Sequence, residues 1–174
     1  AGYQRWAKKF NLKEMSKTLI FLQENKIASL DELNGRADAA AKHFHELQET
    51  IRAADKRMAE ITELRTQIIH YAKTRDVYAA YRKAGYSKQF RTGHEAEILL
   101  HQAAKEFFDK LGLKKLPKVK DLNAEYTELL KQKKVAYPEY RKAREEMQRL
   151  LRAQKNIERF FAEETPQPDR QQSR

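Results

Sequence analysis

Apolar residues recur every three or four positions along two long stretches of the chain. The first stretch contains Phe44, Leu47, Ile51, Ala54, Met58 and Ile61. The second contains Leu122, Tyr126, Leu129, Ala136, Tyr140, Ala143, Met147, Leu150, Ile157 and Phe161, with Lys133 and Gln154 at the intervening positions. A seven-residue apolar repeat places one narrow stripe on a helix, and that stripe is buried only against another helix. The pattern predicts an all-α protein built on a long antiparallel coiled-coil hairpin.

The residues that begin and end helices divide residues 1–164 into two regions. We expect an N-terminal helical segment over residues 1–28 and the hairpin over 29–164, with rods 29–84 and 121–164 and a short tip helix at 94–111. Ser29 is the expected N-cap of the first rod, with Glu32 completing a capping box, and Asp121 the expected N-cap of the second. Gly85 and Gly112 are placed where helices end. The connector between the rods is long enough to reverse the chain.

Two further features concern the second rod and the end of the chain. Pro138 falls inside the rod, where a proline removes a backbone hydrogen bond, so we expect a kink near residues 136–137. Residues 165–174 form a polar tail that we expect to be disordered.

Composition narrows the classes of protein. The 174 residues contain no cysteine, which fits a reducing compartment and a cytoplasmic location. No apolar run is long enough to cross a membrane, and we expect no cofactor. Since the sequence starts Ala-Gly-Tyr, we interpret it as a fragment of a longer protein.

The net charge of +11 is unevenly distributed. Residues 1–30 carry six basic and two acidic side chains, and residues 85–120 carry eight and four, whereas the rods are nearly balanced. The two basic regions are therefore where an anionic partner is expected.

Two groups of residues are candidates for binding nucleic acid. The first, in the connector, is Lys88, Arg91, Lys105, Lys110, Lys114, Lys115, Lys118 and Lys120. Such a group can hold DNA through phosphates, or it can be a solvated loop without a ligand. The second group mixes cations with an aromatic ring: Arg5, Trp6, Lys8, Lys9 and Lys13. Stacking on a single strand needs that mixture, but the spacing of Trp6 and Phe10 favours core positions for both rings.

Histidines provide little evidence for a metal site. His43-Phe44-His45 has the spacing of a metal-binding triplet on a strand, but on a helix the two imidazoles lie on opposite sides of Phe44. Glu97 and His101 share one helix face, and we interpret them as a surface pair. No residue pattern indicates a nucleophile with its base, so we expect no catalysis from this chain.

Several irregular blocks resemble one family. Trp6-Ala-Lys-Lys-Phe-Asn-Leu-Lys, Tyr78-Ala-Ala-Tyr-Arg-Lys, Gly85-Tyr-Ser-Lys, His94-Glu-Ala-Glu-Ile-Leu-Leu-His and Tyr140-Arg-Lys-Ala-Arg-Glu are similar to the region after the nuclease domain in relaxases, the mobilisation nucleases of conjugative elements from Gram-positive gut bacteria. The resemblance covers nearly the whole chain except its last ten residues. It implies a helical accessory region without the family's catalytic residues, within a parent protein that nicks DNA. Pro138 departs from the family pattern.

Two functions remain open. One is a DNA-contacting accessory domain acting at the transfer origin. The other is a protein-interaction coiled coil that binds the coupling ATPase, a relaxosome partner or a second copy of itself. Clustered basic charge favours the first, and long regular apolar stripes favour the second.

Overall fold

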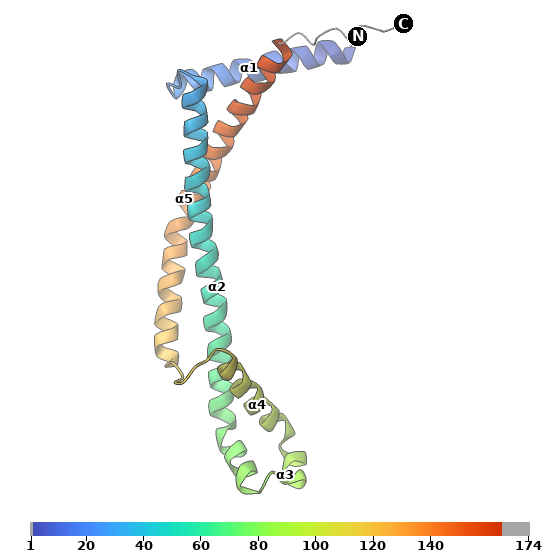
Figure 1. Ribbon diagram of the computed structural model, residues 1–174, viewed down its shortest axis with the longest axis vertical. Helices are drawn as coiled ribbons and strands as arrows, with labels where there is room; N and C mark the ends of the chain where they lie inside the picture. The colour runs from blue at the N-terminus through green and yellow to red at the C-terminus, as the bar shows by residue number, and fades with distance from the viewer. Residues whose placement is uncertain (1, 165–174) are drawn as a thin grey trace. The chain divides into compact units, whose positions relative to one another are not determined.

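The computed structural model describes the backbone of residues 2–164 and the side chains of residues 8–162. Throughout this part of the chain the regular secondary structure is helical, as predicted (Figure 1). The helices are α1 (Gly2–Glu24), α2 (Leu30–Lys83), α3 (Lys88–Gly93), α4 (Glu95–Lys110) and α5 (Val119–Glu164). None of the helices in the described residues is long and apolar enough to cross a membrane. The tail for which disorder was predicted, residues 165–174, lies outside the described residues.

The bounds of the long helices agree closely with the apolar pattern. Helices α2, α4 and α5 begin and end within two residues of the predicted rods and tip helix. The connector also contains α3, which the sequence did not predict. This helix has six residues and buries none of them, so it leaves no apolar periodicity to detect.

The start of α2 follows its predicted cap with one change. The Glu32 amide donates to Ser29 Oγ at 3.1 Å, as an N-cap requires. The Glu32 carboxylate accepts from the Ala28 amide at 2.9 Å, one residue before the partner of a standard capping box. The prediction for α5 was wrong: the helix begins at Val119, and Asp121 lies in its first turn. The Leu122 amide already bonds to the Lys118 carbonyl, so Lys118 takes the position expected for Asp121.

Pro138 lies inside α5 without ending it. A break of the second long helix is therefore excluded. The predicted kink near residues 136–137 stays a prediction.

The chain forms two compact units. Unit 1 contains residues 1–50 and 136–174, and unit 2 contains residues 51–135. Helices α2 and α5 each contribute one segment to each unit, so neither of these helices belongs to one unit alone.

Unit 1 combines α1 with the first segment of α2 and the second segment of α5. Its core contains Ile27, Leu33, Ala37, Leu150 and Ala153. The Gln154 amide donates to Asn34 Oδ1 at 2.7 Å, and the Phe44 and Tyr140 rings stack with centroids 5.1 Å apart. Residue numbers rise along α2 as they fall along α5, so the two segments run antiparallel within this unit.

Unit 2 combines the second segment of α2 with α3, α4 and the first segment of α5. Its core contains Ile61, Leu64, Ala104, Phe108 and Leu122. The Arg57 guanidinium makes two bonds to the Glu125 carboxylate, at 2.7 and 3.1 Å. Asp55 pairs with Lys133, so the α2 and α5 segments are antiparallel here too. The apolar stripes are buried or half-buried except at Phe161, which is exposed.

Candidate nucleic-acid interface

A left-handed turn after α4 starts the basic loop of unit 2. Gly112 has a φ of +65°, a conformation that costs other residues free energy. The Gly112 amide bonds to the Asp109 carbonyl at 3.0 Å, and the Leu113 amide bonds to the Phe108 carbonyl at 3.1 Å. These two bonds form a Schellman motif, which normally brings the residue after the turn against the helix it ends. Leu113 accordingly packs on the core cluster that contains Phe108.

Leucines hold this loop to the core while its lysines face solvent. Leu113 and Leu116 are half-buried against the unit 2 core. We call the exposed cations of this segment the lysine loop: Lys114, Lys115, Lys118 and Lys120. Among the described side chains, none of the four forms an ion pair with a carboxylate, so their charge is not locally neutralised.

The start of α5 adds to the positive potential of the lysine loop. Lys118 precedes the helix and Lys120 lies in its first turn. A helix N-terminus carries roughly half a positive charge from its aligned peptide dipoles, which usually attracts acidic rather than basic side chains. Lys118 and Lys120 add positive charge at this end of α5, and Asp121 is the acidic residue of its first turn.

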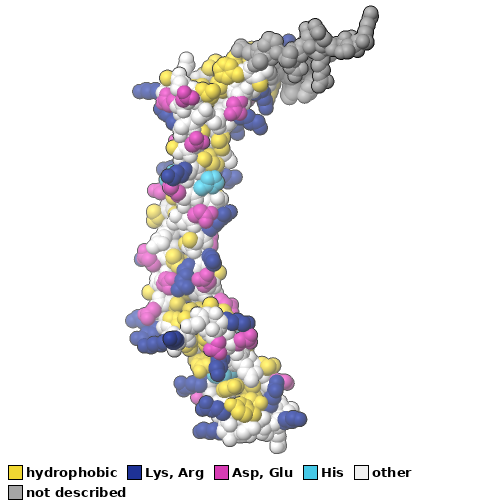
Figure 2. All heavy atoms as spheres, in the orientation of Figure 1, with side chains coloured by type: hydrophobic (Ala, Val, Ile, Leu, Met, Phe, Trp, Pro, Cys, Tyr) yellow, Lys and Arg dark blue, Asp and Glu magenta, His cyan; other side chains and the backbone are white. Residues whose placement is uncertain are grey.

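The other four connector candidates lie on two helices. Lys105 and Lys110 are exposed on α4, and Lys110 pairs with Glu106 at 2.8 Å. Lys88 and Arg91 are on α3, before the start of α4. The 16 residues of α4 span about 24 Å by helix rise, which separates α3 from the lysine loop. The candidates on α3 are therefore a separate group from those of the lysine loop. Figure 2 shows Lys and Arg side chains beside apolar ones over α3 and α4.

The second candidate group lies on α1 in unit 1. Lys8, Lys9 and Lys13 are exposed. The side chains of Arg5 and Trp6 lie outside the described residues. The core position expected for Phe10 was wrong, because 46% of this residue is exposed.

Unit 1 also holds cations that sequence analysis missed. Arg149 and Arg152 on α5 line a cleft of about 190 Å³ together with Lys17 and Thr18 of α1. Glu14 also lines this cleft and pairs with Lys17 at 2.9 Å. The buried Thr18 hydroxyl donates to the Glu14 carbonyl and accepts from the Asn156 amide, both at 2.9 Å, which fixes α1 against α5. The charge of α5 is nearly balanced along the sequence, so only the packing shows that Arg149 and Arg152 share a cleft with Lys17 of α1.

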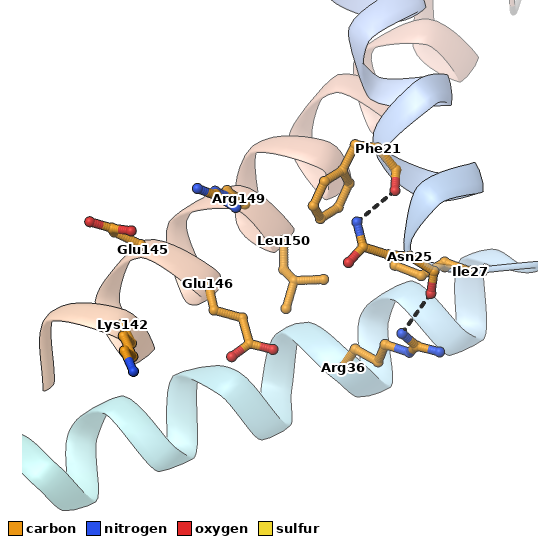
Figure 3. A pocket seen from close by; sticks show the side chains of 9 residues that line it. All are labelled: Phe21, Asn25, Ile27, Arg36, Lys142, Glu145, Glu146, Arg149 and Leu150. Atoms are coloured by element: carbon orange, nitrogen blue, oxygen red, sulfur yellow. Dashed lines mark hydrogen bonds between the residues drawn. The ribbon is translucent and has the colours of Figure 1, made fainter. Parts of the chain in front are cut away.

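A neighbouring cleft of about 340 Å³ shares Phe21 and Arg149 with the first. Figure 3 shows Phe21 and Leu150 facing the space between the helices, whereas Glu145 points away from it. Arg36 is held at its edge by a 2.9 Å bond to the Asn25 carbonyl. Glu145 and Glu146 also line this cleft, so its charge is mixed and less suited to phosphate than the lysine loop.

His101 is not the surface residue predicted from its pairing with Glu97. It is 5% exposed and lies between the rings of Tyr71 and Tyr78, with centroids at 4.5 and 4.3 Å. Burial and then the charge of Lys105 lower the pKa of His101, and hydrogen bonding to the Tyr71 backbone partly offsets both. The sequence could not show this, because the tyrosines lie on a different helix.

The two histidines of the His43-Phe44-His45 triplet are arranged as expected on a helix. His43 and His45 are exposed in the middle of α2 on either side of the buried Phe44. Within the described residues, no group of three or more His, Cys, Asp or Glu side chains is arranged to hold a metal ion.

Comparisons with protein-family models, with curated proteins and with solved structures gave no match for this chain.

Proposed function

We propose that this chain is a non-catalytic accessory domain that binds the phosphate backbone of DNA through the lysine loop. The observation that carries the proposal is the exposure of Lys114 and Lys115 in the segment before α5 and of Lys118 and Lys120 at its start, without ion pairs among the described carboxylates. Contacts of this kind neutralise phosphates and release counterions, so they do not depend on base sequence. The leucines of the loop keep the four cations on the surface.

The proposal includes a more specific fold. In it, α2 and α5 form an antiparallel coiled-coil hairpin, with α4 as the helix of its tip. The antiparallel contacts within each unit and the burial of both apolar stripes support this arrangement. A coiled coil of this kind holds the lysine loop at a fixed position along its length.

The proposal also includes a biological setting. The resemblance of the Trp6 block and the Gly85 block to relaxases supports a position after a DNA-nicking domain in a longer, cytoplasmic mobilisation protein. In that setting the chain contacts DNA of the transfer origin while the nuclease domain acts. Relaxosome or coupling proteins are its further partners.

The direct test is a DNA titration at two salt concentrations. We expect the chain to bind both a single-stranded and a double-stranded oligonucleotide, with affinity that falls steeply between about 50 and about 200 mM salt. Affinity that is independent of salt would contradict phosphate binding. No binding at low micromolar concentration and low salt would contradict the proposal as a whole.

A second function is favoured by one observation. Large apolar side chains are exposed on α4 and at its end, among them Leu99, Leu100 and Leu111. Exposed apolar groups are common on protein surfaces, but neighbouring ones such as Leu99 and Leu100 can contribute to protein contacts. In this alternative the chain is a protein-interaction coiled coil that binds a coupling protein or a second copy of itself. Sedimentation velocity over a range of concentrations tests self-association.

A further inference from the structure

The largest cleft described in unit 2 lies beside the lysine loop. It has a volume of about 600 Å³ and lies between α2, the segment after α4 and the start of α5. Its apolar lining consists of Leu64, Leu111, Leu113, Leu116, Pro117 and Leu122. This volume is within the range of roughly 300–1,000 Å³ found for binding clefts.

The charged side chains that line this cleft are three cations and two carboxylates. Lys115 and Lys118 line it and have no ion pair among the described carboxylates, while Lys114 and Lys120 flank it in sequence. Arg57 and Glu125 also line it, but they bond to each other and neutralise one another. Asp121 is the remaining acidic residue of the lining. The lysines therefore match an anionic partner, and the leucines and the proline of the lining match an apolar one.

The apolar side chains of the lining indicate the chemical class of the partner. Leucine and proline side chains offer no aromatic face on which a nucleic-acid base can stack. They do offer apolar contacts to leucine-like side chains of another protein. Leu111, at the mouth of the cleft, is 54% exposed and would be covered by such a partner.

The fold distinguishes the conformation of the partner. The described part of the chain contains no strand, so it has no sheet edge to which an extended peptide can add. A helix presents apolar residues at positions three and four apart, which is the standard way to fill a groove between helices. We propose that the cleft binds an acidic amphipathic helix of a partner protein, with its leucines over Leu111 and Leu116 and its carboxylates at Lys115 and Lys118.

One consequence depends on the proposed DNA binding. Lys115 and Lys118 would contact phosphates in one complex and carboxylates in the other. A bound acidic helix would therefore exclude DNA from the lysine loop, and the partner would act as a switch for DNA release.

A synthetic peptide tests the proposal on the full chain. The probe is a fluorescein-labelled peptide of about 14 residues, or two heptads, with leucines at the a and d positions and mostly glutamates elsewhere. Its control has the same composition with the leucines scattered around the helix. We expect saturable binding by fluorescence anisotropy for the first peptide and much weaker binding for the second. Equal binding of both would overturn the proposal, and so would the absence of binding by the first.

Two variants locate the contact. Leu111→Gln removes an exposed leucine from the cleft and should weaken peptide binding about tenfold, since a leucine contact is lost. The matched control is Leu99→Gln, an exposed leucine on α4 outside the cleft lining. Equal effects of the two variants would overturn the location.

The DNA measurement separates this proposal from the proposed function. Leu111→Gln should leave DNA affinity unchanged, because phosphate contacts do not use the leucine. Peptide binding without DNA binding would leave the cleft assignment intact and contradict only the proposed function. DNA binding without peptide binding would leave the proposed function intact and contradict only the cleft assignment.

Discussion

The Thr74 hydroxyl and the His101 Nδ1 atom lie 3.0 Å apart in the interior of unit 2. The Thr74 hydroxyl also bonds to the His70 carbonyl at 2.7 Å. The direction of its contact with His101 follows the tautomer of the ring: an Nδ1–H donates to the hydroxyl oxygen, and an unprotonated Nδ1 accepts from the hydroxyl. The contact joins α2 to α4 through a polar group within an otherwise aromatic cluster.

Stability should fall as the pH is lowered through the range of histidine titration. The folded state lowers the pKa of His101, so the unfolded chain takes up the proton first. The stability that depends on neutral His101 is therefore present above the ordinary pKa of about 6.5 and is lost as the pH falls through it. Urea midpoints at about pH 7.5 and about pH 5.5 measure the effect.

A substitution separates His101 from the other titrating groups. His101→Phe keeps a ring between the two tyrosines and removes the titration, so its midpoint should depend less on pH than that of the wild type. His43→Gln removes an exposed histidine and should behave as the wild type does. If wild type and His101→Phe lose the same stability on acidification, His101 is not the source.

Thr74→Val should destabilise the protein by about 1 kcal/mol, because the His101 Nδ1 atom loses its hydrogen-bond partner in the interior. Thr66→Val is the matched control on the same helix: Thr66 is exposed and its hydroxyl bonds to the Thr62 carbonyl. Its effect should lie within about 0.5 kcal/mol of zero. Similar losses for both variants, measured by urea unfolding, would show that the contact with His101 adds nothing.

Two glycine substitutions should have opposite signs. Gly35 lies inside α2 with open space around an added Cβ, so Gly35→Ala should stabilise by about 1 kcal/mol. Gly112 has a positive φ, so Gly112→Ala should destabilise by about 1 kcal/mol or more. Thermal unfolding of both variants measures this difference. A stabilising Gly112→Ala would contradict the left-handed turn that begins the lysine loop.

The long helices were predictable because their signals are local. The apolar repeat through Phe44 and Ile61, and the cap formed by Ser29, depend on residues within one or two turns of each other. The burial of His101 was not predictable, because it depends on Tyr71 and Tyr78, which lie far away in sequence and on another helix.

The candidate sites also differ in whether they depend on local sequence or on packing between helices. The lysine loop was visible as a run of cations, and its exposure follows from alternation with Leu113 and Leu116. The cleft lined by Arg149, Arg152 and Lys17 was missed, since the charge of α5 is balanced along its length and only packing against α1 brings these residues together.

The most direct test of the lysine loop is the salt dependence of DNA binding in a charge variant. The variant replaces Lys114, Lys115, Lys118 and Lys120 with Gln. Its control replaces four exposed lysines elsewhere, Lys42, Lys56, Lys73 and Lys134, so both proteins lose the same charge. We expect the loop variant to bind DNA of any sequence more weakly, with a log–log salt slope flatter by about 2–4, and the control to stay close to the wild type. A loop variant that binds as tightly as the control at low salt, with the same slope, would contradict the account.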